Sequence, residues 1–107
     1  MMMSPVKRDP HARLLRLLLA MAGEGAEILS SSSRSWSSAT FSGARHKAVL
    51  KISGGDAHVR AGQLAAKLPE AEFQLPGHIV ADAVVEAWTW ESGKATMELA
   101  LLTVEDW

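Results

Sequence analysis

Residues 79–104 read IVADAVVEAWTWESGKATMELALLTV, and this stretch decides the fold. β-Branched and aromatic residues are frequent in its first half, and Ser92-Gly93 is a two-residue turn signal between the two halves. A turn at this dipeptide pairs Trp88 with Met97 and Trp90 with Ala95. We therefore predict an antiparallel hairpin, with a helix over residues 79–90 as the competing interpretation.

The predicted hairpin is apolar on both faces. One face carries Ala81, Ala83, Val85, Ala87, Ala100, Leu102 and Val104. The other carries Val84, Trp88, Trp90, Met97, Leu99 and Leu101, together with Asp82 and Glu86. Helices in so short a chain cover one face of a sheet only, and a large uncovered apolar patch marks an interface or a ligand groove. We predict that the face with the tryptophans binds a protein partner or a second copy of the chain as a homodimer.

A second hairpin is predicted upstream, within residues 36–53. A turn at Gly43-Ala44 pairs Phe41 with His46 and sorts both strands into an apolar and a polar face. Seven serines fall within residues 30–38, just before this hairpin. We interpret them as the end of one strand, a turn and the start of the next, rather than as a linker.

Two helices complete the predicted fold. Leucines at helical spacing indicate a helix over residues 10–22, and a second apolar stripe indicates another between Asp56 and Pro69. We predict a two-layer α+β domain over residues 10–107, preceded by a disordered tail at residues 1–9. Its elements follow in the order α-β-β-β-α-β-β, with both helices on one face of an antiparallel sheet of four to five strands.

The composition excludes several kinds of site. The chain has 107 residues, no cysteine and a net charge of −1, so disulfides, thiolate nucleophiles and cysteine-based metal sites are ruled out. The lack of cysteine favours the reducing cytosol, and no apolar run is long enough to span a membrane. The four histidines are not clustered at metal-motif spacing. We therefore expect no metal, no cofactor and no catalytic residues.

One group of polar residues is an alternative functional site. His78, Asp82 and Glu86 share strand parity, so they would line one face of the hairpin. Alternate same-face positions lie about 13 Å apart in a strand, which is too far for one metal ion or one reacting atom. The alternative hypothesis is therefore a small apolar-ligand pocket under Trp88, or a minor enzyme, with these groups orienting the ligand.

The charges are unevenly distributed. Basic residues gather in the middle of the chain and acidic residues in its C-terminal half, so the two regions are expected to neutralise each other within the fold or across an oligomer. A third hypothesis is nucleic-acid contact through the basic hairpin, which carries Arg34, Trp36, Arg45, Lys47 and Lys51. The slightly acidic net charge counts against it.

Overall fold

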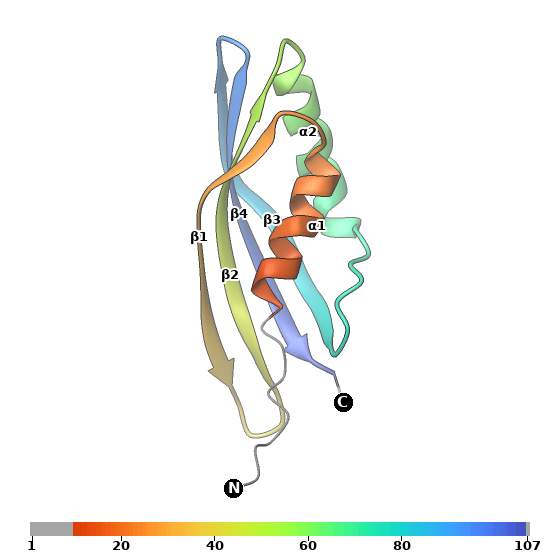
Figure 1. Cartoon of the computed structure of the whole chain (residues 1–107). Helices are drawn as coiled ribbons and strands as arrows, with labels where there is room; N and C mark the ends of the chain where they lie inside the picture. Colours follow the sequence, from red (N-terminus) through yellow and green to blue (C-terminus); the bar gives the residue numbers. More distant parts are fainter. Residues whose placement is uncertain (1–9, 107) are drawn as a thin grey trace, which may run out of the picture.

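The structure is a computed structural model that describes residues 10–106. Its elements are α1 (His11–Ala22), β1 (Ala26–Ser37), β2 (Ser42–Ser53), α2 (Ala57–Lys67), a short 3₁₀ helix η1 (Leu68–Glu70), β3 (His78–Glu91) and β4 (Lys94–Glu105). Figure 1 shows a layer of four long strands with both helices on one side of it. The predicted two-layer α+β class is confirmed. The predicted tail at residues 1–9 lies outside the described residues.

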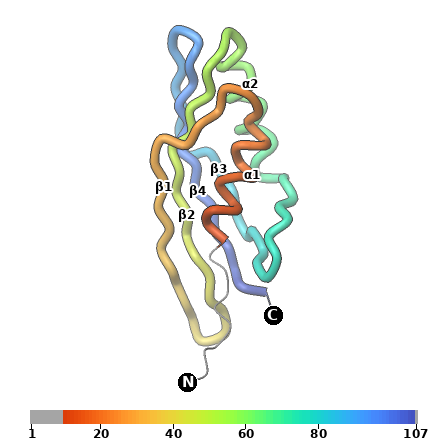
Figure 2. The backbone as a smooth tube through the Cα atoms, in the orientation of Figure 1, coloured from red at the N-terminus to blue at the C-terminus, as the bar shows by residue number. Residues whose placement is uncertain are grey.

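The sheet has the strand order β1-β2-β4-β3, and every neighbouring pair is antiparallel. Each half of the chain is a helix followed by a hairpin, and the two hairpins meet at the central pair β2–β4. Figure 2 shows the two hairpins running past each other and turning at opposite ends of the molecule. The described part of the chain contains four strands in the order α-β-β-α-β-β, because the serine-rich segment continues β1 and forms no separate strand.

The hydrophobic core lies between the helices and one face of the sheet. Leu14 and Leu18 of α1 and Leu64 of α2 pack onto Leu50 and Met97, which project from the central strands. Helices of 11 and 12 residues are about 17 Å long, whereas strands of 12 to 14 residues are about 40–46 Å long. The tips of the hairpins therefore extend beyond the helices, and the molecule measures 55 × 26 × 20 Å.

The predicted register of the first hairpin is wrong. The turn lies at residues 38–41, where the Ser38 N–H donates to the Phe41 carbonyl at 2.7 Å. His46 therefore pairs with Ser33, not with Phe41. Gly43 lies inside β2 and not in the turn. A side chain at this position would collide with the neighbouring strand, since an added Cβ would lie 1.9 Å from the Thr103 carbonyl oxygen. Close packing of the strands, and not a turn, therefore explains why this residue is a glycine.

The second hairpin is confirmed near its turn and differs further away. Residues 79–90 are strand, and Trp88 pairs with Met97 as predicted. Ser92 and Gly93 both have positive φ, as a tight two-residue hairpin turn requires. Beyond Ala87 the register shifts at two places, between residues 85 and 87 and between residues 80 and 82. At each irregularity, the β3 residues farther from the turn change the side of the sheet that they face.

These shifts decide which of two adjacent valines faces the core. Val85 pairs with Leu99 and packs against the core, whereas Val84 pairs with Ala100 on the other face. We expect Val85→Asp to lower the free energy of unfolding by about 2–4 kcal/mol, because a carboxylate would enter the core. Val84→Asp is expected to cost less than about 1 kcal/mol. Urea denaturation at low protein concentration measures both, and equal losses would show that the parity reversal is wrong.

Candidate interaction surface on the open face of the sheet

The sheet face that points away from both helices is called the open face here. On β2 and β4 the buried residues alternate with the ones that form it. The open face comprises Glu27, Ser30, Ser32, Arg34 and Trp36 on β1; Gly43, Arg45, Lys47, Val49 and Lys51 on β2; Thr96, Glu98, Ala100, Leu102 and Val104 on β4; and Ile79, Asp82, Val84, Glu86, Ala87 and Thr89 on β3.

Cross-strand pairing arranges this surface in rows across the four strands. One row consists of Trp36, Gly43, Val104 and Ile79, and is apolar from edge to edge. Ile79 is 52% exposed, while Trp36 and Val104 are half-buried. An adjoining row consists of Arg34, Arg45, Leu102 and Asp82. The open face therefore has an apolar end with a charged row beside it.

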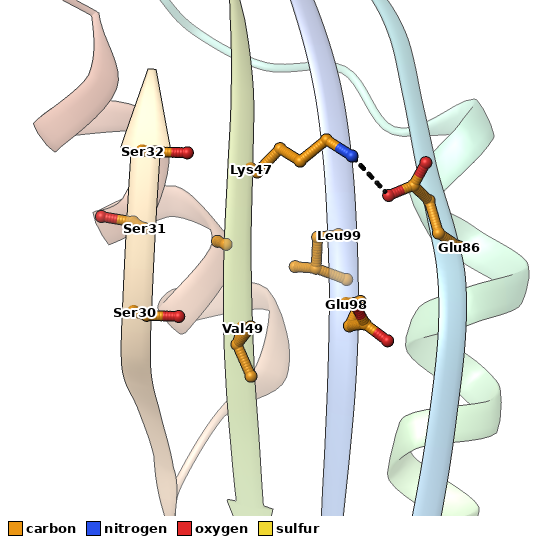
Figure 3. A pocket seen from close by; sticks show the side chains of 9 residues that line it. Ser30, Ser31, Ser32, Lys47, Val49, Glu86, Glu98 and Leu99 are labelled. Atoms are coloured by element: carbon orange, nitrogen blue, oxygen red, sulfur yellow. Dashed lines mark hydrogen bonds and ion pairs between the residues drawn. The ribbon is translucent and has the colours of Figure 1, made fainter.

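Two lysines of the open face form ion pairs with carboxylates of neighbouring strands. Lys47 on β2 reaches across β4 to Glu86 on β3, with Nζ 3.1 Å from Oε1 (Figure 3). Lys51 on β2 pairs with Glu27 on β1 at 2.8 Å.

A hollow of about 270 Å³ lies beside the Lys47–Glu86 pair. It is lined in part by Ser30, Val49 and Glu98, and Figure 3 shows these side chains spread over neighbouring strands. Its lining mixes two carboxylates, one ammonium group and serine hydroxyls. Such a surface is suited to polar contacts rather than to enclosing an apolar ligand.

The structure places most of the predicted contact residues in the core. Met97 is 0% and Leu99 1% exposed, and Leu101 is also buried. Trp88 packs against the same core from β3. Trp90 is 56% exposed, but it stacks on His58 of α2 with ring centroids 4.7 Å apart.

The prediction of which sheet face is uncovered is therefore wrong for this hairpin. The helices cover the face with the larger side chains, because these fill the space between the layers, and only Val84 of the predicted set lies on the open face.

The predicted polar group is not brought together. Asp82 and Glu86 lie on the open face, but His78 faces the helix layer, where it lines a hollow with Arg13 and Pro76. The irregularity between residues 80 and 82 reverses the alternation of side chains along β3, so His78 lies on the opposite face from Asp82 and Glu86. Trp88 itself packs against the hydrophobic core beneath the helices. The predicted site residues therefore do not form a common pocket.

The predicted basic residues, by contrast, share one face. Arg34, Trp36, Arg45, Lys47 and Lys51 all lie on the open face, although the register that predicted their grouping is wrong. Both lysines are neutralised by carboxylates of the same chain. The cationic character that remains is concentrated at the two arginines.

A polar chain inside the domain was not predicted. His11 of α1 and His46 of β2 face each other with Nδ1 atoms 2.9 Å apart, ring planes 10° apart and centroids 5.2 Å apart. In an imidazole ring the centroid lies about 1.15 Å from Nδ1. The centroid distance equals the Nδ1–Nδ1 distance plus this length in each ring, so both Nδ1 atoms lie on the line between the centroids. The rings therefore meet edge to edge in one plane. The outer nitrogens contact Ser31 Oγ at 3.1 Å and Thr103 Oγ1 at 2.9 Å.

We assign the proton positions in this chain starting from its inner end. Thr103 Oγ1 donates to the Ala44 carbonyl, so it accepts from His46 Nε2. His46 Nδ1 then accepts from His11 Nδ1, and His11 Nε2 accepts from the Ser31 hydroxyl. Because His46 and Thr103 are 1% and 0% exposed, we assign the chain a structural role in fastening the start of α1 to the sheet. The two histidines are 35 residues apart, so no sequence spacing indicates them.

Comparisons of the chain with protein-family models, with curated proteins and with solved structures found no match. Within residues 10–106, no three histidine or carboxylate side chains gather as a metal site would require. The helices of the same part of the chain are too short or too polar to cross a membrane. The functional argument therefore rests on the geometry of the open face.

Proposed function

We propose that this protein is a non-catalytic module that self-associates through its open face. The observation that carries the proposal is the apolar row of Trp36, Val104 and Ile79, which continues into Leu102 on a face that no helix of residues 10–106 covers. Antiparallel sheets with one face in water usually alternate apolar and polar residues along each strand. Here the outward positions at the end of β4 are Ala100, Leu102 and Val104, which are all aliphatic and half-buried, and Lys47 crosses the strand beside Ala100.

The size of the open face is consistent with a specific contact. Four strands about 4.8 Å apart and about 26 Å of strand length give about 500 Å² for each copy. Two copies would bury about 1,000 Å² together, which is the lower bound for a specific interface. This area favours a dimer that dissociates at low concentration over an obligate one.

The direct test is the mass in solution at about 100 μM, measured by light scattering. We expect twice the monomer mass of 11.5 kDa for the wild type. Leu102→Glu is expected to return the mass to that of the monomer, because it places a carboxylate beside the apolar row. The matched control is Val59→Glu, which changes an exposed aliphatic residue of α2 on the helix layer and is expected to leave the mass unchanged.

Thermal unfolding of both variants shows whether they remain folded. A wild-type monomer at about 100 μM would contradict the proposal, since that concentration exceeds the dissociation constants of typical specific dimers. A dimer that Leu102→Glu does not weaken would also contradict it, because the contact would then lie elsewhere.

A further inference from the structure

One row of the open face carries an electrostatic conflict. Arg34 and Arg45 pair directly with each other on β1 and β2, and like charges in that position repel. Within the described residues, neither guanidinium has an ion pair. Asp82 lies at the other end of the same row, is exposed, and likewise has no ion pair within residues 10–106. The two arginines and the aspartate are separated by Leu102.

Symmetry limits how two identical faces can stack. In aligned packing two sheets keep their strand directions within about 30° of each other, so the two-fold axis lies either across the strands or along them. An axis across the strands sets β1 on β1 and β2 on β2, so Arg34 of one copy never faces Asp82 of the other, and four arginines meet where the axis crosses their row. An axis along the strands, between β2 and β4, sets β1 on β3 and β2 on β4 of the second copy.

We infer that two copies of this chain pack face to face about an axis parallel to the strands, with Arg34 of each copy against Asp82 of the other. The inference rests on the proposed self-association and names its arrangement and the residues that specify it. It matches charges without any change in the fold, because both groups occupy the same row at opposite edges of the sheet.

The apolar row fits this arrangement as well. Trp36 at one edge of its row meets Ile79 of the second copy, and Gly43 meets Val104 of the second copy. The indole of Trp36 lies over Gly43, with Nε1 3.0 Å from the position of an added Cβ, so Val104 of the second copy meets the indole as well as the glycine. The arrangement thus gives each large side chain of the row an apolar or a small neighbour across the interface.

The test exchanges the two charges. Arg34→Asp and Asp82→Arg are each expected to weaken the dimer at least tenfold. Each substitution places two like charges opposite each other, and the two-fold symmetry repeats this contact at the second site. The double variant R34D/D82R reverses both charges and is expected to recover affinity to within about threefold of the wild type. Sedimentation velocity over a concentration series gives the dissociation constants. Arg16→Asp, an exposed arginine of α1, is the matched control and is expected to leave the constant unchanged.

The outcomes separate this inference from the proposed function. A dimer that Leu102→Glu breaks, but whose affinity the double variant does not restore, overturns the arrangement and leaves self-association through the open face standing. A dimer that tolerates Leu102→Glu and both charge reversals joins through another surface, such as the free edge of β1, and overturns both. A monomeric wild type that binds a DNA duplex, weakly at high salt and less in Arg34→Asp, also overturns both.

Discussion

Replacing Gly43 with alanine lowers the free energy of unfolding by about 2–4 kcal/mol, as chemical denaturation would measure it. The added Cβ would lie 1.9 Å from the Thr103 carbonyl oxygen and 3.0 Å from Nε1 of Trp36. The oxygen belongs to the backbone of β4, so the clash is relieved only if the central strands β2 and β4 move apart. That movement would weaken the pairing that joins the two halves of the domain.

Gly62→Ala is the matched control and is expected to change stability in the opposite direction. Gly62 lies within α2, and a Cβ there meets only Trp88 Cζ2, at an ordinary contact distance of 3.9 Å. Alanine in a helix interior is more stable than glycine by about 0.5–1 kcal/mol. If Gly43→Ala costs less than about 1 kcal/mol, the close approach of β2 to β4 is not as described.

His46→Ala is the second substitution with a large expected effect. It removes a fully buried ring, leaves a cavity and deprives the Thr103 hydroxyl of its hydrogen-bond donor. It also breaks the contact of His11 Nδ1 with β2, so the first turn of α1 loses one of its links to the sheet. We expect the free energy of unfolding to fall by about 2–4 kcal/mol.

His58→Ala serves as its control, because His58 is exposed and contacts Trp90 by ring stacking. Its expected cost is about 1 kcal/mol or less. Hydrogen exchange adds a spatial readout, since His46→Ala is expected to speed exchange in α1 more than in α2. Equal costs for the two histidines would contradict the role assigned to the buried chain.

The fold class and one hairpin follow from local sequence patterns. Ser92-Gly93 occupies a turn that requires positive φ at both residues, and this local demand fixes Trp88 opposite Met97. The register of the other hairpin does not follow from the sequence in the same way. A glycine between two predicted strands is typical of a turn, yet Gly43 allows β4 to approach β2 closely, and this long-range contact is not visible in the local sequence.

The open face was only partly predictable. The separation of basic and acidic residues along the chain predicted mutual neutralisation; the ion pair Lys47–Glu86 joins the two regions, whereas Arg34, Arg45 and Asp82 have no ion pair within residues 10–106. The grouping of Trp88 with Met97, Leu99 and Leu101 on one face followed from strand alternation, but alternation does not show which face the helices cover, and they cover this one. The register shift near Glu86 added a second error, because it moves Val84 to the opposite face from Trp88, and alternation alone does not reveal such irregularities.

The most direct test of the central claim is oxidative labelling of side chains at about 1 μM and about 100 μM protein, read out by mass spectrometry. Burial of the open face predicts that labelling of Trp36 and Leu102 falls at the higher concentration, while labelling of Trp90, which lies on the helix side, stays constant. Equal labelling of Trp36 and Leu102 at both concentrations would contradict self-association through this surface.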